Sequence, residues 1–122
     1  MQHSDLSTGR WNKLSVSAQF ANIGSEVGRA MSAHEQGLTA RHEAALTRAF
    51  ELIDLTLVNP ALRSSARREI SRVRELVADY FYGDNSYKTS REQWDRYFTP
   101  FAVAANAARS ETVLFSPMRN NK

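Results

Sequence analysis

The chain has 122 residues, of which 42% are hydrophobic, and a formal net charge of +3. A chain of this length forms one domain around one core. It contains no cysteine, which excludes disulfides, thiolate zinc sites and cysteine nucleophiles. No apolar run approaches the about 20 residues of a membrane span, and residues 1–13 lack the apolar stretch of a secretion signal. We therefore expect a soluble, cytoplasmic protein with no membrane partner.

The hydrophobic pattern predicts an all-α fold. Four segments have the helical spacing of apolar residues, namely 15–35, 39–59, 60–83 and 90–109. The connections between them are short, which makes successive helices antiparallel. We expect an up-down-up-down four-helix bundle over residues 14–109, preceded by a flexible N-terminal segment, 1–13, and followed by a C-terminal tail, 110–122.

The first predicted helix begins at an N-cap, Ser15, and has two different faces. Its apolar stripe consists of Val16, Phe20, Ile23, Val27 and Met31. Its other face carries only small residues, namely Ser17, Ala21, Gly24, Gly28 and Ser32. Each glycine inside a helix costs about 1 kcal/mol relative to alanine, so something must compensate. The favoured compensation is close approach of a second helix, within the bundle or between subunits; the alternative is a ligand that approaches bare backbone.

The second predicted helix carries a carboxylate in an unfavourable place. It ends because Pro60 forces Asn59 out of the helical conformation, and its inward residues are Leu46, Ala49, Phe50, Ile53 and Leu57. Asp54 lies in the C-terminal half of this helix, where a negative charge opposes the helix dipole. We expect a structural ion pair with Arg63 or Arg67, which follow the turn; the alternative interpretation is a catalytic acid.

The third predicted helix has a cationic flank. Its apolar stripe is Ala66, Ile70, Val73, Val77 and Tyr80, and the segment 60–83 holds five arginines against three acids. Arginine binds phosphate with a planar fork, so Arg63, Arg67, Arg72 and Arg74 are the candidate residues for binding RNA or DNA. The alternative is a solvated charged face in a protein from a GC-rich genome.

The fourth predicted helix follows a C-cap at Gly83 and a turn. It begins with a capping box, either Ser90 with Gln93 or Thr89 with Glu92. Its inner stripe is Trp94, Tyr97, Phe98, Phe101, Ala105 and Ala108. The run Thr112–Phe115 in the tail is apolar enough to dock as a short clasp.

Two histidines are predicted to meet at one end of the bundle. His34 closes the first apolar stripe and His42 opens the second, so both point into the same end, where acidic and aromatic residues also lie. Imidazoles and carboxylates together could bind a metal or transfer protons. Neither histidine has the Glu-x-x-His spacing of di-iron bundles, and polar capping of the bundle end is the alternative. We expect no cofactor and assign no catalytic residue.

Several stretches resemble a known family. They are QFANIGSEVGRA (19–30), FELIDLT (50–56), DYFYGDNSY (79–87), WDRYF and FAVAANAAR. Together they resemble a family of short uncharacterised prokaryotic helical proteins. More distantly, residues 22–26 are similar to a stretch of the four-helix bundles of ribosomal RNA intervening sequences and of the accessory variability determinant of diversity-generating retroelements. That resemblance implies a basic, oligomeric bundle and, for the retroelement relative, a reverse-transcriptase partner that binds nucleic acid.

Three functional hypotheses follow from the residues. The first, which we favour, is a non-catalytic helical bundle that self-associates as a homo-oligomer or docks on a protein partner through the small face of its first helix. The second is an accessory bundle that binds RNA or DNA phosphates through the arginine-rich third helix. The third is a metal or acid-base site at the end that holds His34 and His42.

Overall fold

The structure, a computed structural model, describes residues 8–115 and the side chains of residues 9–107. Within this range the fold is all-α, as predicted, and contains no strand. Its helices are α1 (Thr8–Asn12), α2 (Val16–Glu35), α3 (Thr39–Leu57), α4 (Ser64–Tyr82) and α5 (Arg91–Phe115). The predicted four-helix up-down-up-down arrangement is not confirmed, because the described residues form a fifth helix. None of the described helices is long and apolar enough to cross a membrane.

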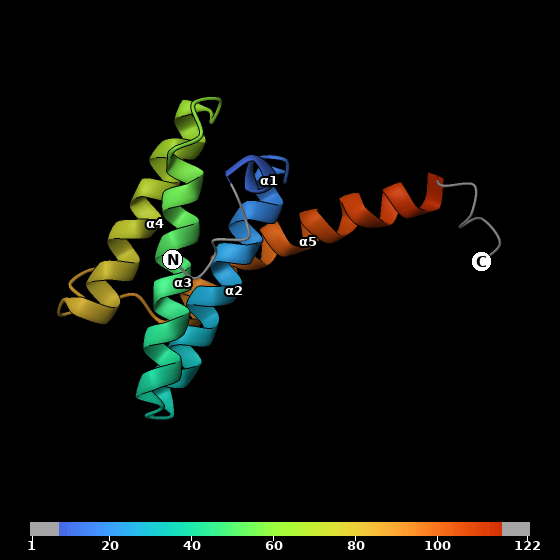
Figure 1. Cartoon of the computed structure of the whole chain (residues 1–122). Coiled ribbons are helices and arrows are strands. Elements are labelled where there is room, and N and C mark those ends of the chain that lie inside the picture. Colours follow the sequence, from blue (N-terminus) through green and yellow to red (C-terminus); the bar gives the residue numbers. More distant parts are fainter. Residues whose placement is uncertain (1–7, 116–122) are drawn as a thin grey trace.

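The helices are arranged around an antiparallel hairpin of α2 and α3 (Figure 1). The closest helix packing joins α2 to α3 and α2 to α5, while α4 packs more loosely on α3. As Figure 1 shows, α4 lies on one side of the hairpin and α5 crosses α2 on the other, with its outer half extending away from the remaining helices. The hairpin is therefore the central element of the fold.

Local capping confirms two predicted helix starts, whereas α3 ends at Leu57 rather than at Asn59, and α4 begins at Ser64 rather than at residue 60. The hydroxyl of Ser15 accepts a hydrogen bond from the N–H of Ala18 at 3.0 Å, so Ser15 is the N-cap of α2. At the start of α5, the Ser90 N–H donates to Gln93 Oε1 and the Gln93 N–H donates to Ser90 Oγ. This is the first of the two predicted capping boxes. Gly37 ends α2 with a φ of +71°, which glycine adopts without strain.

The core consists mainly of the predicted stripes. Its most deeply buried apolar side chains include Phe20, Ile23, Val27, Met31, Leu46, Ile53, Ile70, Val73 and Val77. Val16, which the pattern placed on the first stripe, is exposed instead, because it lies in the first turn of α2. Phe101 contacts this core as well, since its ring centroid lies 4.7 Å from that of Phe20.

The segment expected to be a flexible start, 1–13, contains a buried anchor. Residues 8–12 form α1, and Trp11 is only 1% exposed. Its indole Nε1–H donates to Thr56 Oγ1 at 3.0 Å, and its carbonyl accepts from Gln19 Nε2 at 2.9 Å. The described end of this segment is therefore part of the core rather than a loose extension.

The C-terminal helix is longer than expected. The sequence predicted a helix that ends at residue 109 and a tail over 110–122, whereas α5 continues to Phe115. Residues 116–122 of the expected tail lie outside the described residues. The outer half of α5 leaves the other helices (Figure 1), and Val103 is 60% exposed.

Candidate functional site

The small face of α2 is partly covered by α5. A Cβ atom added to Gly24 would lie 2.4 Å from Cγ of Phe98, so only glycine lets α5 approach this closely. Ala21 and Gly24 also line a shallow hollow of about 190 Å³ together with Phe98 and Ala102. A Cβ added to Gly28 would meet nothing within 4 Å. The close helix approach that was predicted to offset the cost of the glycines therefore occurs at Gly24, and the approaching helix is α5 of the same chain.

Asp54 forms an ion pair with a partner that the sequence did not suggest. Its Oδ1 lies 3.2 Å from Nε of Arg74, and the two side chains are 56% and 47% exposed. The Arg74 guanidinium also lies 5.2 Å from the centre of the Phe50 ring. The predicted partners, Arg63 and Arg67, are wrong because the register of α4 along α3 places Arg74 beside Asp54. Because both side chains are open to solvent, Asp54 does not lie in a shielded site of the kind that a catalytic acid occupies.

Arg67 instead caps the end of α3. Its guanidinium donates hydrogen bonds to the carbonyl oxygens of Leu57 and Asn59, the latter at 2.8 Å. Carbonyls at a helix C-terminus lack partners within the helix, and a cation there also suits the helix dipole. Arg67 therefore stabilises the end of α3, a structural role that the sequence pattern did not predict.

Two further predicted phosphate ligands, Arg72 and Arg74, also contact groups of their own chain. Nη2 of Arg72 lies 3.1 Å from Oε2 of Glu69, and the hydroxyl of Tyr97 donates a hydrogen bond to the same oxygen at 2.6 Å. The Tyr97 hydroxyl and Arg72 lower the pKa of Glu69, while burial and the carboxylate raise the pKa of Tyr97. Of the four arginines proposed for nucleic acid, Arg63 is exposed at the start of α4. The structure thus gives three of them intramolecular contacts.

A cavity of about 310 Å³ lies between α4 and the first turns of α5. It is lined by Arg72, Val73, Leu76, Tyr87, Thr89, Gln93, Trp94 and Tyr97. Trp94, which was predicted to lie on the inner stripe of the fourth helix, is 4% exposed here, and its Nε1 is buried without a hydrogen-bond partner. The pattern of the sequence gave no indication of this cavity, because α4 and α5 contribute its walls from separate segments.

The two histidines meet as predicted, in aromatic surroundings. The ring centroids of His34 and His42 are 5.0 Å apart, and Phe81 stacks on His42 at 5.2 Å. Tyr80 lies edge-on to His34. Among the described residues, no group of three or more histidine, aspartate or glutamate side chains is placed to hold a metal ion.

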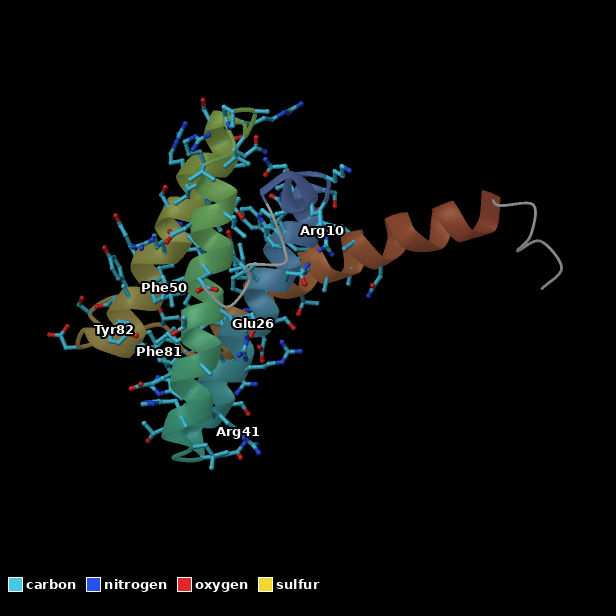
Figure 2. The ribbon with its side chains drawn as sticks, viewed as in Figure 1. Arg10, Glu26, Arg41, Phe50, Phe81 and Tyr82 are labelled. Atoms are coloured by element: carbon cyan, nitrogen blue, oxygen red, sulfur yellow. The ribbon has the colours of Figure 1, made fainter. Side chains whose placement is uncertain are left out.

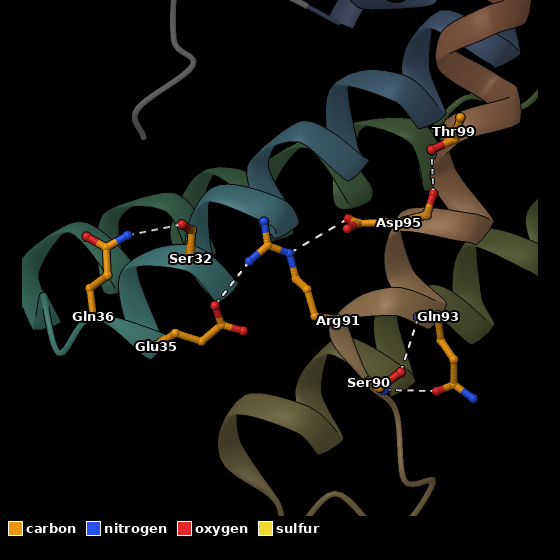
Figure 3. Close-up of polar contacts among 8 residues, drawn as sticks. All are labelled: Ser32, Glu35, Gln36, Ser90, Arg91, Gln93, Asp95 and Thr99. Atoms are coloured by element: carbon orange, nitrogen blue, oxygen red, sulfur yellow. Dashed lines mark hydrogen bonds and ion pairs between the residues drawn. The ribbon is translucent and has the colours of Figure 1, made fainter.

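The acids expected at this end have other partners. Glu35 and Asp95 both pair with Arg91, which ties the end of α2 to the start of α5 (Figure 3). Asp79 accepts hydrogen bonds from the loop that follows α4. These three acids are therefore held by groups other than the two imidazoles.

A basic groove on the α2/α3 hairpin was missed by the sequence analysis. It has a volume of about 380 Å³ and is lined by Arg29, Ser32, Ala33, Gln36, Leu38, Arg41, Ala44, Ala45 and Arg48. We call it the arginine groove. A signal was present in the sequence, because Arg29, Ser32, Ala33 and Gln36 repeat the spacing of Arg41, Ala44, Ala45 and Arg48.

Comparisons with family models, with curated proteins and with solved structures give no significant match to this chain. The resemblance to prokaryotic helical bundles therefore stays a prediction. The function has to be argued from the surfaces that this chain itself presents.

Proposed function

We propose that this protein is a helical interaction protein that self-associates through the outer half of α5. We define this projecting segment as residues 102–115. It replaces the small face of α2 as the favoured surface, because α5 of the same chain already covers Gly24. The single observation that carries the proposal is the extension of α5 beyond the other helices (Figure 1).

The described side chains of the projecting segment are apolar except for Asn106, and most are accessible. Over residues 102–107 the sequence is Ala-Val-Ala-Ala-Asn-Ala, and each of these residues is exposed except Ala105, which is half-buried. A continuous exposed apolar surface marks an interaction site more often than a free surface. Alanines also allow the backbones of two helices to approach closely.

The spacing of apolar residues supports a helical partner. Positions 94, 98, 101, 105, 108, 112 and 115 of α5 follow alternating steps of four and three, and all of them are apolar except Thr112. This is the heptad spacing of helices that pack along one another. The first three positions are Trp94, Phe98 and Phe101, and they pack against the core of the same chain. The same pattern continues into the projecting segment, where Figure 1 shows no other described helix alongside it.

A second copy of the chain is the partner that this surface fits best. Two projecting segments related by a twofold axis would each supply the same alanine-rich stripe, so the same residues would be buried on both copies of the chain. An isolated stretch of about this length is marginally stable as a helix in water, so pairing would also stabilise it.

Native mass measurement on matched variants tests the proposal. Ala105→Glu places a charge on the heptad stripe, whereas Ala107→Glu places the same charge on the same segment beside the stripe. We expect the unaltered protein and Ala107→Glu to be dimers in sedimentation velocity experiments and Ala105→Glu to be a monomer. An unaltered protein that stays monomeric over a wide range of concentration would contradict the proposal.

A further inference from the structure

We propose that the arginine groove on the α2/α3 hairpin binds an anion that carries at least two phosphate groups. The groove lies on different helices from the projecting segment of α5, so this inference does not depend on the proposed self-association. Four observations carry it: the spacing of the arginines, the acid that holds two of them, the small floor and the charge balance.

The antiparallel hairpin brings two matching rows of residues together. In each row the lining residues follow steps of three, one and three, so they share one face of their helix. Arg48 on α3 lies beside Arg29 on α2, because both contact Glu26. Arg41 lies seven residues before Arg48, which is a distance of about 10 Å along α3. The groove therefore has a cationic group toward each of its ends.

A largely buried acid holds the paired arginines in position. The side chain of Glu26 is 12% exposed; its Oε1 lies 3.1 Å from Nε of Arg48 and its Oε2 lies 3.3 Å from Nη1 of Arg29. Figure 2 shows Glu26 on the same hairpin as Arg41, which lies nearer the turn. A guanidinium has five N–H donors, so Arg29, which contacts Glu26 through Nη1, can still bind a second acceptor. Fixing the fork in advance reduces the entropy lost when a ligand binds.

The floor of the groove is small and partly polar. Ala33 and Ala45 are buried, and Ala44 is half-buried, so no long side chain fills the space between the arginines. Gln36 Nε2 donates to Ser32 Oγ at 3.3 Å (Figure 3). The hydroxyl proton of Ser32 and the second amide proton of Gln36 add neutral donors of the kind that accompany arginine in phosphate sites.

The charge balance favours a ligand with several negative charges. Among the described residues, the lining of the groove includes three arginines and no acidic side chain, and Glu26 contacts two of these arginines. A single carboxylate could reach one end only, whereas linked phosphates present oxygens toward both ends. Arginine binds phosphate oxygens in pairs, which gives geometric specificity as well as attraction. The two sources of such a group are a free polyphosphate and the backbone of a nucleic-acid strand.

Binding of sodium tripolyphosphate to the full chain tests the inference. Arg41→Gln removes a groove arginine that is exposed and has no part in the core, and Arg63→Gln removes an exposed arginine from α4 as a matched control. In calorimetric titrations at low salt, we expect Arg41→Gln to weaken binding about tenfold or more and Arg63→Gln to leave it nearly unchanged. Arg41→Lys, which keeps the charge but loses the fork, should recover part of the affinity.

Further titrations separate phosphate recognition from general attraction and identify the source. Citrate, a tricarboxylate, should bind more weakly than tripolyphosphate at equal ionic strength. A single-stranded oligonucleotide that displaces tripolyphosphate from the unaltered protein would assign the site to a phosphodiester backbone, and failure to displace it would assign the site to free polyphosphate. No binding at low salt, equal binding of citrate, or equal losses in Arg41→Gln and Arg63→Gln would each overturn the inference.

Discussion

Phe98 of α5 lies directly against Gly24 of α2, so close that a Cβ at position 24 would be 2.4 Å from the ring carbon Cγ and 2.8 Å from the Cβ of Phe98. The contact includes the Cβ atom of Phe98, and rotation of the Phe98 side chain does not move that atom. Phe98 is also buried in the core. This contact therefore sets how closely α5 crosses α2, and with it the direction in which the projecting segment leaves the protein.

Alanine substitutions at the two glycines of α2 should have opposite effects. Gly24→Ala forces Phe98 to move and should lower the free energy of unfolding by about 1 to 3 kcal/mol. Gly28→Ala meets nothing within 4 Å, so its higher helix propensity should raise the free energy of unfolding by up to about 1 kcal/mol. Urea unfolding followed by circular dichroism measures both. Equal effects of the same sign would mean that the contact with Phe98 has no energetic weight.

The buried hydrogen bond between Trp11 and Thr56 supports the start of the chain. Thr56→Val keeps the shape of the side chain and removes the acceptor of the indole N–H, which would then be buried without a partner. We expect the free energy of unfolding to fall by about 1 to 3 kcal/mol. The indole proton of Trp11 should also shift in the NMR spectrum, while that of Trp94 serves as an internal control. An unchanged unfolding midpoint would show that the N–H finds another acceptor.

We expect substitutions at Arg67 and Asp54 to change the free energy of unfolding by different amounts. Arg67→Ala removes the Arg67 hydrogen bond to the carbonyl of Leu57 and one of the two hydrogen bonds to the carbonyl of Asn59, which also accepts from the Leu62 N–H. We expect it to lower the free energy of unfolding by about 1 to 3 kcal/mol. Asp54→Ala breaks an exposed ion pair with Arg74 and should change it by about 0 to 1 kcal/mol. Thermal melts of the two variants compare them directly. A larger loss for Asp54→Ala would reverse the assigned roles.

Local signals predicted the helices well, because each depends on residues that are close in sequence. Ser15 and the pair Ser90 and Gln93 mark helix starts through their own hydrogen bonds. Pro60 predicted a helix end at Asn59, whereas α3 ends at Leu57. The short helix that carries Trp11 was missed because a helix of 5 residues has no measurable periodicity.

The candidate surfaces depend on packing between helices, which the sequence pattern does not specify. Arg74 rather than Arg67 meets Asp54 because of the register of α4 on α3, and residue types alone do not determine that register. The arginine groove forms because Arg29 and Arg48 come from two helices that Glu26 joins. In the sequence, each row of the groove reads as an ordinary solvated helix face. Contacts of this kind become visible only when the hairpin is assembled.

The carboxylate of Asp79 organises the loop between α4 and α5. It accepts hydrogen bonds from the N–H groups of Ser86 and Tyr87, at 3.0 and 3.1 Å, and from the Ser86 hydroxyl. Burial by itself would raise the pKa of Asp79, but these hydrogen bonds outweigh it and lower the pKa below the usual value of 3.8. The folded protein therefore holds the ionised form more strongly than the unfolded chain does.

Acidification should consequently loosen this loop. Because the pKa is lowered on folding, the stabilisation is present above the unfolded pKa of about 3.9 and is lost as the pH falls through the lower folded value. Asp79→Asn cannot be ionised, so we expect it to melt at a lower temperature than the unaltered protein at neutral pH, with the difference shrinking below about pH 4. Asp84→Asn, a change at an exposed position in the same loop, is the matched control and should leave the melting temperature nearly unchanged. A difference between Asp79→Asn and the unaltered protein that is the same at every pH would show that the charge of Asp79 does not hold the loop.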